Sequence, residues 1–531
     1  MTNKGNEDGM VIKYDESGEV EWAERIGGSS KDYITAVAEC NDGGYIVGGY
    51  FGSSSIDLGS GISLTSKNSD DGMVIKYGSS GEVEWAKRIG GTNQDYIESV
   101  SETSDGGCIV GGFLGSSSID LGNGVSLTNK AYDDGMIIKY SSSGEVEWAK
   151  GIGGTNNEYI RAVAESRDGG YIVGGYFSSS SINLGNGVSL INKGSDDGML
   201  IKLEKTELPN PTVIKAQGIG ETNDDYIESV AGTSDGGYIV GGYFQSSSID
   251  LGNEISLTNK GNDDGMVIKY SQDWEVEWAK GIGGTSSDYI NSVAECSDGG
   301  YIVGGYFESS SIDLGNGISL TSHNVGGGFT DGMVIKYSQD GEVEWAKGIG
   351  GTYEDRITSV AECNDGGYIV GGFFYSNSID LGNGISLTNK ESYDGMAIKY
   401  SKDGEVEWAK GIGGTSDEYI ATVSETSDGG YIVGGYFASS RIDLGNEISL
   451  TKKGSCDGMV IKYSQDGEAE WTQGIGGTDN EYINSVAECN DGGYIVGGYF
   501  YSNNINLENG VSLTNKSSST SYSDGMVIKY S

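Results

Sequence analysis

Alternating apolar and polar positions divide the chain into short segments with the pattern of β-strands. In a representative stretch, residues 289–295 alternate, an Asp-Gly-Gly turn follows, and residues 301–307 resume the β-rich pattern. Asp-Gly between two such runs predicts a β-hairpin. A second hairpin is predicted from residues 333–337 and 342–347. No segment keeps the i, i+3, i+4, i+7 spacing of a helix, and glycine interrupts every longer stretch, so we expect an all-β protein.

One segment, Asp-Gly-Met-Val-Ile-Lys-Tyr or a near copy, recurs nine times and bounds eight repeats. Successive copies are spaced by 63 or 67 residues, as their methionines show: Met10, Met73, Met136, Met199, Met266, Met333, Met396, Met459 and Met526. The long copies carry their extra residues at 206–211, 323–329 and 517–520, where turns are expected. A stack of rigid units tolerates insertions in such connections.

Four antiparallel strands repeated eight times must cover their faces and edges, and radial packing around an axis does both. We therefore predict a single domain over residues 1–531, an eight-bladed β-propeller, rather than an open β-solenoid. The strand at 289–295 is expected to be innermost and the tryptophan-bearing strand outermost. The closing blade is expected to combine residues 1–28 and 478–531.

The closing blade leaves one question open. Residues 10–14 and 526–530 both copy the third strand, and only one of them is expected to occupy its place; the sequence does not decide which. Residues 2–6 copy residues 258–262, so the chain begins in mid-repeat. Whether it is a full-length protein or one cut within a repeat stays open.

Three parts of the repeat resemble known propeller blades. The strand ending in Gly304-Gly305, the strand around Met333 and the strand bearing Trp345 resemble kelch-type blades. The segment 340–345, Asp-Gly-Glu-Val-Glu-Trp, is similar to the tryptophan-docking segments of quinoprotein-like eight-bladed propellers. Bacterial propeller repeats that join an Asp-Ala/Gly-x-Val-x-Lys strand to a tryptophan strand and a Gly-Gly loop resemble it most closely. The resemblance implies a scaffold and names no activity.

Charge and hydropathy narrow the partners. The chain has 78 acidic and 33 basic side chains, a formal net charge of −45. Such a charge repels phosphate backbones, so we expect no nucleic-acid partner. No apolar run is long enough to predict membrane insertion, and no basic-then-apolar leader is visible at the start. We expect a monomer of undetermined compartment, with a segment of a larger secreted or surface protein as one alternative.

The residues that would support metal or nucleophilic chemistry are few. The six cysteines form no CxxC pair and the single histidine is His323, which argues against a zinc site, a disulfide framework and a Ser-His-Asp or Cys-His set. Residues 262–265 come nearest to a calcium loop, but no copy has the EF-hand pattern, so calcium is only a weak alternative to having no cofactor. No adjacent cysteine pair of the quinoprotein kind is present. A carboxylate pair for glycoside cleavage stays open, although near-identical blades do not suggest one asymmetric site.

Other repeated residues have structural interpretations. The paired glycines predict close backbone approach and a bulge rather than a phosphate cradle. The third-strand lysines predict cross-strand ion pairs with the Glu-Val-Glu of the fourth strand. Tryptophan recurs at one outer-strand position, except in the fourth repeat, where Lys215 stands, and is expected to pack between blades. The set is Trp22, Trp85, Trp148, Trp278, Trp345, Trp408 and Trp471.

One face of the ring is expected to carry both long connections of each blade. The first is the loop after the second strand, which contains a small hairpin such as 311–321, and the second is the return from the fourth strand to the first strand of the next blade. Function tends to collect on such loops. Here every repeat has an acidic residue: Asp32, Asp95, Glu158, Asp225, Asp288, Asp355, Glu418 and Glu481. Each carboxylate either accepts N–H bonds within its own loop or contributes to a ring at the channel mouth that binds a cation or a basic partner.

The functional prediction is a non-enzymatic binding or display scaffold that meets a protein or a glycan on the long-loop face. Several similar sites could raise avidity by roughly 10²–10⁴. The alternatives are a purely structural module and, third, a quinoprotein-like or hydrolase enzyme. Recent amplification of one blade would also explain the sameness without any selected site. Variation is greatest at one position that is expected to face the channel: Thr35, Glu98, Arg161, Glu228, Asn291, Thr358, Ala421 and Asn484.

Overall fold

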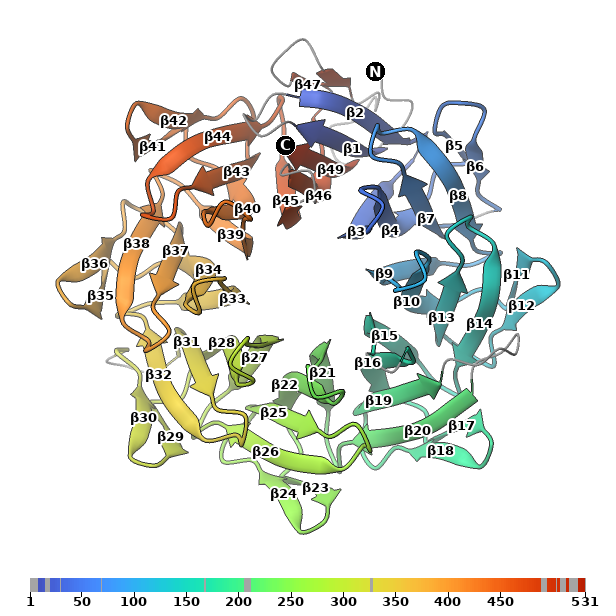
Figure 1. Ribbon diagram of the computed structural model, residues 1–531, viewed down its shortest axis with the longest axis horizontal. Helices are drawn as coiled ribbons and strands as arrows, with labels where there is room; N and C mark the ends of the chain where they lie inside the picture. Colours follow the sequence, from blue (N-terminus) through green and yellow to red (C-terminus); the bar gives the residue numbers. More distant parts are fainter. Residues whose placement is uncertain are drawn as a thin grey trace.

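Eight β-sheets are arranged radially around a central axis in the computed structural model (Figure 1). The structure describes residues 8–14, 20–28, 30–67, 69–166, 169–204, 212–324, 328–488, 494–502, 504–506, 512–514 and 524–530. Within these residues every regular element is a β-strand. The predicted eight-bladed propeller is confirmed, with the tyrosine-bearing strand innermost and the tryptophan-bearing strand outermost.

Each blade has four classes of strand from the channel outward. The innermost strands are β3 (Asp32–Glu39), β9 (Asp95–Glu102), β15 (Glu158–Glu165), β21 (Asp225–Gly232), β27 (Asp288–Glu295), β33 (Asp355–Glu362), β39 (Glu418–Glu425) and β45 (Glu481–Glu488). The second strands are β4 (Tyr45–Phe51), β10 (Cys108–Leu114), β16 (Tyr171–Phe177), β22 (Tyr238–Phe244), β28 (Tyr301–Phe307), β34 (Tyr368–Phe374), β40 (Tyr431–Phe437) and β46 (Tyr494–Phe500). The third strands are β1 (Asp8–Tyr14), β7 (Asp71–Tyr77), β13 (Asp134–Tyr140), β19 (Asp197–Glu204), β25 (Asp264–Tyr270), β31 (Asp331–Tyr337), β37 (Asp394–Tyr400), β43 (Asp457–Tyr463) and β49 (Asp524–Tyr530). The outer strands are β2 (Val20–Gly27), β8 (Val83–Ile89), β14 (Val146–Ile152), β20 (Thr212–Ile219), β26 (Val276–Ile282), β32 (Val343–Ile349), β38 (Val406–Ile412) and β44 (Ala469–Ile475).

Blades 1 to 7 begin with β3, β9, β15, β21, β27, β33 and β39, and β45 begins the closing blade. A short hairpin between the second and third strands projects from the rim of each blade (Figure 1). The hairpin strands are β5 (Ser55–Asp57), β6 (Ser63–Thr65), β11 (Ser118–Gly122), β12 (Val125–Thr128), β17 (Ser181–Gly185), β18 (Val188–Ile191), β23 (Ser248–Gly252), β24 (Ile255–Thr258), β29 (Ser311–Gly315), β30 (Ile318–Thr321), β35 (Ser378–Gly382), β36 (Ile385–Thr388), β41 (Arg441–Gly445), β42 (Ile448–Thr451), β47 (Asn504–Asn506) and β48 (Ser512–Thr514). In blade 5, Ile312 and Leu320 of this hairpin are buried in the blade core. The hairpins therefore extend the blades outward, away from the central axis.

The closing blade contains both copies of the third strand, in the order β2-β1-β49-β46-β45. Each copy keeps the antiparallel partner nearest to it in sequence, β2 for β1 and β46 for β49. The copies then meet in parallel through Val11–Val527 and Ile12–Ile528. The expectation that only one copy fits is thus corrected: the closing sheet has five strands, because neither copy has to give up its own hairpin.

The paired glycines serve two different contacts. A Cβ on Gly305 would lie 2.0 Å from the carbonyl oxygen of Tyr289, and one on Gly304 would lie 2.5 Å from Val360 of the next blade. The strand pairing shifts between Ile290 and Ser292, which leaves Asn291 as a bulge. The predicted close approach and bulge are both confirmed.

The tryptophans whose side chains the structure describes join neighbouring blades, whereas the side chain of Trp22 lies outside the described part of the chain. Trp278 donates its indole N–H to the carbonyl of Gln339, in a turn of the next blade, at 3.1 Å. Its ring lies between Tyr301 and Tyr337 of that blade, at 5.5 and 5.6 Å between centroids. A Cβ on Gly341 would be only 2.5 Å from the indole, so the turn needs glycine there. Inter-blade packing by tryptophan is confirmed.

One blade boundary reverses this arrangement. Blade 3 carries Lys215 in place of tryptophan, while blade 4 carries Trp274 in place of the turn glycine. Trp274 lies 5.7 Å from both Tyr238 and Tyr270, the two tyrosines that correspond to those around Trp278. Lys215 donates to the backbone carbonyl of Asp273. The indole therefore fills the same place, but it comes from the other side of the boundary.

Six of the third-strand lysines are buried ion-pair partners: Lys76, Lys139, Lys269, Lys336, Lys399 and Lys462. Lys139 Nζ lies 3.0 Å from Asp105 and 3.2 Å from Glu147, and it donates to the carbonyl of Tyr140. The predicted pairing with the fourth strand is confirmed, and the aspartate of the Asp-Gly-Gly turn is a further partner. Cys40, Cys108, Cys296, Cys363 and Cys456 are buried, whereas Cys489 lies outside the described residues. None of the described elements is a helix that could cross a membrane.

Candidate functional site

One side of the ring, here called the loop face, gathers both long connections of every blade. In blade 5, Asp288 at the start of β27 pairs with Phe307 at the end of β28, which pairs with Asp331 at the start of β31. Gly332 in turn pairs with Ile349 at the end of β32. The connections between blades and those leading to the rim hairpins therefore leave from the same edge, as predicted. The tight turns lie on the opposite side.

The repeated acidic residues lie at this edge, and all eight are fully buried: Asp32, Asp95, Glu158, Asp225, Asp288, Asp355, Glu418 and Glu481. Asp95 shows the common pattern. Its Oδ2 accepts the N–H of Gly91 at 3.0 Å and the hydroxyl of Ser116 at 2.5 Å, and its Oδ1 accepts the N–H of Ser116 at 2.9 Å. These bonds join the carboxylate to the loops around it, as in the interpretation from sequence in which each carboxylate accepts N–H bonds locally. A role for this set in binding a cation or a basic partner stays a prediction.

A second buried carboxylate, at the start of the third strand of the preceding blade, accompanies the seven acidic residues from Asp95 to Glu481. A Cβ on Gly220 would lie 2.7 Å from Asp197 Oδ1 and 2.7 Å from Asp225 Oδ2, so both carboxylates approach one glycine. Burial raises the pKa of Asp355 to about 7, against its bonds to Ser376 and Gly351, and the charge of Asp331 adds to the rise. Among the described residues no group of three or more His, Cys, Asp or Glu could hold a metal ion.

A belt of aromatic side chains runs around the loop-face end of the innermost strands. It alternates between the second residue of the first strand and the sixth residue of the second strand, and its rings are partly exposed. Neighbouring centroids lie close, as for Tyr96–Phe113 at 4.8 Å and Phe113–Tyr159 at 5.0 Å. The belt comprises Tyr33, Tyr50, Tyr96, Phe113, Tyr159, Tyr176, Tyr226, Tyr243, Tyr289, Tyr306, Phe373, Tyr419, Tyr436 and Tyr482. The sequence pattern does not predict this belt, although tyrosine recurs at one repeat position in every copy but that of Arg356.

On four blade boundaries a tyrosine of the belt is fixed by an aspartate of the preceding blade. We call these bonds the tyrosine latches. The hydroxyl donors and carboxylate acceptors are Tyr96 and Asp70 (2.9 Å), Tyr159 and Asp133 (2.9 Å), Tyr226 and Asp196 (3.1 Å), and Tyr289 and Asp263 (2.7 Å). Blades 1 to 5 are therefore joined by a repeated hydrogen bond as well as by their cores.

The repetition ends at blade 5. Thr330, Tyr393 and Cys456 occupy the places of the latch aspartates, and Arg356 occupies the place of a belt tyrosine. The Arg356 guanidinium lies 4.2 Å from the ring centroid of Tyr306 and 2.7 Å from Glu354.

An aromatic cluster begins at this boundary and continues along blade 6. It consists of Phe329, Tyr353, Tyr375 and Tyr393 and is called the aromatic sector below. Consecutive rings lie 5.6, 5.4 and 4.8 Å apart, and Tyr393 joins the belt through Tyr419 at 5.4 Å.

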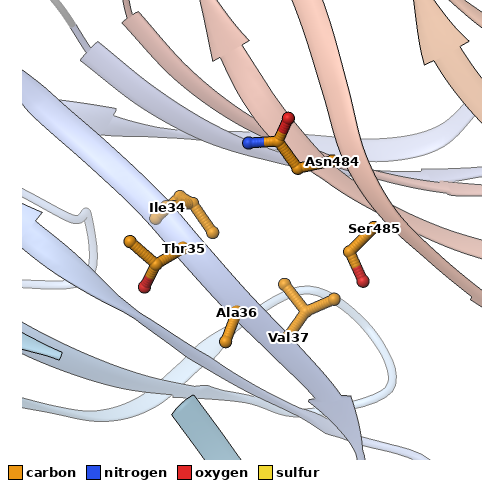
Figure 2. Close-up of a pocket in the computed structure, with 6 residues that line it drawn as sticks. All are labelled: Ile34, Thr35, Ala36, Val37, Asn484 and Ser485. Atoms are coloured by element: carbon orange, nitrogen blue, oxygen red, sulfur yellow. The ribbon is translucent and has the colours of Figure 1, made fainter. Parts of the chain in front are cut away.

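The variable position of the innermost strand lies at the bulge and is partly exposed, as expected for a residue facing the channel. Arg161 reaches Glu98 of the preceding blade at 3.5 Å. Thr35 donates instead to the carbonyl of Ile97 in the next blade at 2.6 Å. Where the first and last inner strands meet, a small pocket is lined by residues 34–37 of β3 and by Asn484 and Ser485 of β45 (Figure 2).

Comparisons with known proteins support a propeller repeat protein. No family model matches the chain. An uncharacterised WD repeat-containing protein of Acanthamoeba polyphaga mimivirus is 21% identical over 506 residues, which cover 87% of this chain and 34% of the viral protein. The regulatory protein FlaEY of Caulobacter vibrioides is 22% identical over 372 residues, which cover 67% of this chain and 38% of FlaEY. The chain thus spans about a third of the length of these relatives.

Among solved structures, Sqt1 from Chaetomium thermophilum aligns with a TM-score of 0.45 at 12% identity, over 88% of this chain and 94% of Sqt1. The chain is a propeller repeat protein, as predicted. The finer resemblance to kelch-type, quinoprotein-like and bacterial repeats stays a prediction.

Proposed function

We propose that this propeller is a non-enzymatic protein-interaction scaffold that meets its partner on the loop face. The observation that carries the proposal is the aromatic belt. Its aromatic side chains remain partly exposed, although each lies on a rigid strand of the closed propeller. Tyrosine supplies a large contact area at low cost in side-chain entropy, and it is enriched at protein interfaces.

The rest of the blade supports the same proposal. The blade cores, the tryptophan docking and the buried lysine pairs fix the backbone, so that a partner would meet a preformed surface. The WD-repeat relative points to the same class of scaffold. Belt positions recur in neighbouring blades, so an extended partner could contact several of them at once.

The test compares two variants of the full chain. Peptides selected from a random phage-displayed library against the native protein should bind at least fivefold more weakly to Tyr243→Ala, which interrupts the belt. They should bind unchanged to Gln339→Ala, whose side chain is exposed on the opposite side. Thermal unfolding by circular dichroism would show that both variants remain folded.

A glycan array run with the same proteins tests the other ligand class. Selected peptides that bind both variants equally, or belt-dependent signals on glycans alone, would contradict the proposal. No selection of any peptide and no glycan signal would favour a purely structural module.

A further inference from the structure

We propose that the aromatic sector of blades 5 and 6 binds an arginine-rich segment of a partner protein. The inference rests on the proposed function and names the site and the chemistry of the partner.

Exposure sets the aromatic sector apart from the rest of the described surface. The exposed large apolar side chains are Tyr132, Ile191, Ile214, Phe329, Tyr353 and Tyr375. Three of these six lie in the aromatic sector, with Phe329, Tyr353 and Tyr375 exposed by 41%, 38% and 37%. They form one continuous row of rings instead of being scattered singly. Clustered exposed aromatic groups mark interaction sites, whereas isolated ones need no explanation.

The other repeats show that ring closure does not require these rings. The place of Tyr353 is taken elsewhere by Ser30, Asn93, Asn156, Asn223, Ser286, Ser416 and Asp479. The place of Tyr375 is taken elsewhere by Gly52, Gly115, Ser178, Gln245, Glu308, Ala438 and Tyr501. Phe329 belongs to a connection lengthened in this repeat. Apart from Tyr501 in the closing blade, the other blades have small or polar residues at these places, so the aromatic sector is not a requirement of the fold.

Within the belt, the cations that lie over tyrosine rings are arginine guanidiniums, whereas Lys202 and Lys399 lie over the buried rings of Tyr238 and Tyr431. Arg356 places its guanidinium 4.2 Å from the centroid of Tyr306, beside the aromatic sector. Arg161 lies 5.5 Å from Tyr176 and 6.0 Å from Tyr159 on the opposite part of the belt. A guanidinium within about 6 Å of such a ring is attracted by the negative face of its π-system. A partner's arginine could make the same contact with the exposed rings.

The geometry of the aromatic rings and the net charge of the chain favour a guanidinium group over a sugar ring. Phe329 stands at 70° to Tyr353, and Tyr353 at 64° to Tyr375. Each pair is packed edge to face, so the rings do not form the level platform on which a sugar ring stacks.

Carboxylates are within reach of such a guanidinium. Glu354 accepts the hydroxyl of Tyr393 at 2.8 Å, Asp417 accepts that of Ser392, and Glu391 is exposed nearby in sequence. The net charge of −45 would steer a basic segment toward the ring.

Fluorescence anisotropy with labelled oligo-arginine and oligo-lysine peptides of equal length tests the inference. The native chain should bind oligo-arginine more tightly than oligo-lysine, and the preference should persist at raised salt. Tyr353→Ala/Tyr375→Ala should weaken oligo-arginine binding by roughly tenfold, the sum of two exposed cation–π contacts. Tyr353→Phe/Tyr375→Phe should keep the binding, because the ring faces remain. Tyr132→Ala, which removes an exposed tyrosine outside the aromatic sector, should have no effect.

Three results would overturn the inference: equal binding of both peptides, full loss of binding with salt, or a double alanine variant that binds like the native chain. Loss of a glycan-array signal in that variant without loss of peptide binding would also overturn it in favour of a carbohydrate. The proposed function fails separately, when peptides selected from the random library ignore Tyr243→Ala. Selected peptides that depend on Tyr243 but not on Tyr353 and Tyr375 would leave the scaffold proposal standing and refute this one.

Discussion

The boundary between blades 1 and 2 and the boundary between blades 6 and 7 have the same strand order and the same kinds of core residue. On the loop face they differ. The first boundary has a hydrogen bond from Tyr96 to Asp70 at 2.9 Å, and the second has a stack of Tyr393 on Tyr419 at 5.4 Å. Both boundaries close equally well, so the latch is not what holds the ring together. The difference teaches that the core specifies the propeller while the loop face can change from one sector to another.

The largest expected effect tests whether the blade cores are equivalent on the two sides of the point where the tyrosine latches end, in blade 4 and in blade 6. A Cβ on Gly242, in blade 4, would lie 2.0 Å from the carbonyl of Tyr226, and one on Gly372, in blade 6, would lie 2.0 Å from that of Arg356. Alanine at either place must displace backbone, and we expect each to lose roughly 3 kcal/mol or more of stability. Urea unfolding of the two variants measures this. A clear difference between them would show that the sectors differ in their cores as well.

The next effect concerns the reversed tryptophan. Trp274→Gly empties the place between Tyr238 and Tyr270 and should cost about 3 kcal/mol, as expected for deleting a large buried ring. Adding Lys215→Trp should recover most of the loss, because the indole then comes from blade 3 as it does at other boundaries. Thermal unfolding of the single and double variants checks this. A double variant no more stable than Trp274→Gly would contradict the exchange.

Stability should rise as the pH falls from 8 toward 5. Burial raises the pKa of Asp95 to about 6 and that of Asp355 to about 7, both from 3.8. Between pH 4 and pH 7 the native state therefore binds more protons than the unfolded state, and stability falls with rising pH. The Lys139 ion pair has the opposite effect on stability, but only in strong acid. It helps to lower the pKa of Asp105 to about 2, so its stabilising contribution is lost as the pH falls toward 2.

Melting temperatures across this range measure the effect. Asp355→Asn should flatten the pH dependence more than Asp95→Asn, since its group has the larger shift. A melting temperature that falls from pH 8 to pH 5 in the native chain would refute the assignment.

The smallest effect tests the latch itself. Tyr96→Phe removes one hydrogen bond to Asp70 and should cost about 1 kcal/mol. Thr330→Asp with Arg356→Tyr should build a latch at the boundary between blades 5 and 6 and gain a similar amount. Denaturant unfolding measures both. A Tyr96→Phe variant as stable as the native protein would mean that the hydrogen bond only orients the aromatic side chain.

Sequence reasoning predicted the features that every repeat states in the same way. The eight blades, the strand order, the bulge at Asn291 and the role of the tryptophans all follow from eight copies of one pattern. It could not decide between the two interpretations of the acidic position, because a polar residue at the start of a strand looks the same whether it is buried or exposed.

Sequence reasoning missed the latch, the aromatic belt and the exchange of Lys215 and Trp274. These depend on which residues meet across a blade boundary, and that is fixed by three-dimensional packing rather than by spacing within a repeat. A tryptophan that occurs in one repeat only, such as Trp274, also gives no periodic signal.

The reversed tryptophan makes the order of the blades matter. If blade 4 were to follow blade 2, Trp148 and Trp274 would compete for one space. If blade 3 were to precede any other blade, Lys215 would face a glycine turn with no indole to cover it. Blades 3 and 4 are thus a matched pair that cannot be shuffled independently, even though their neighbours could exchange places with little loss. A ring that looks like eight copies of one part contains, between blades 3 and 4, a junction that fits in only one way.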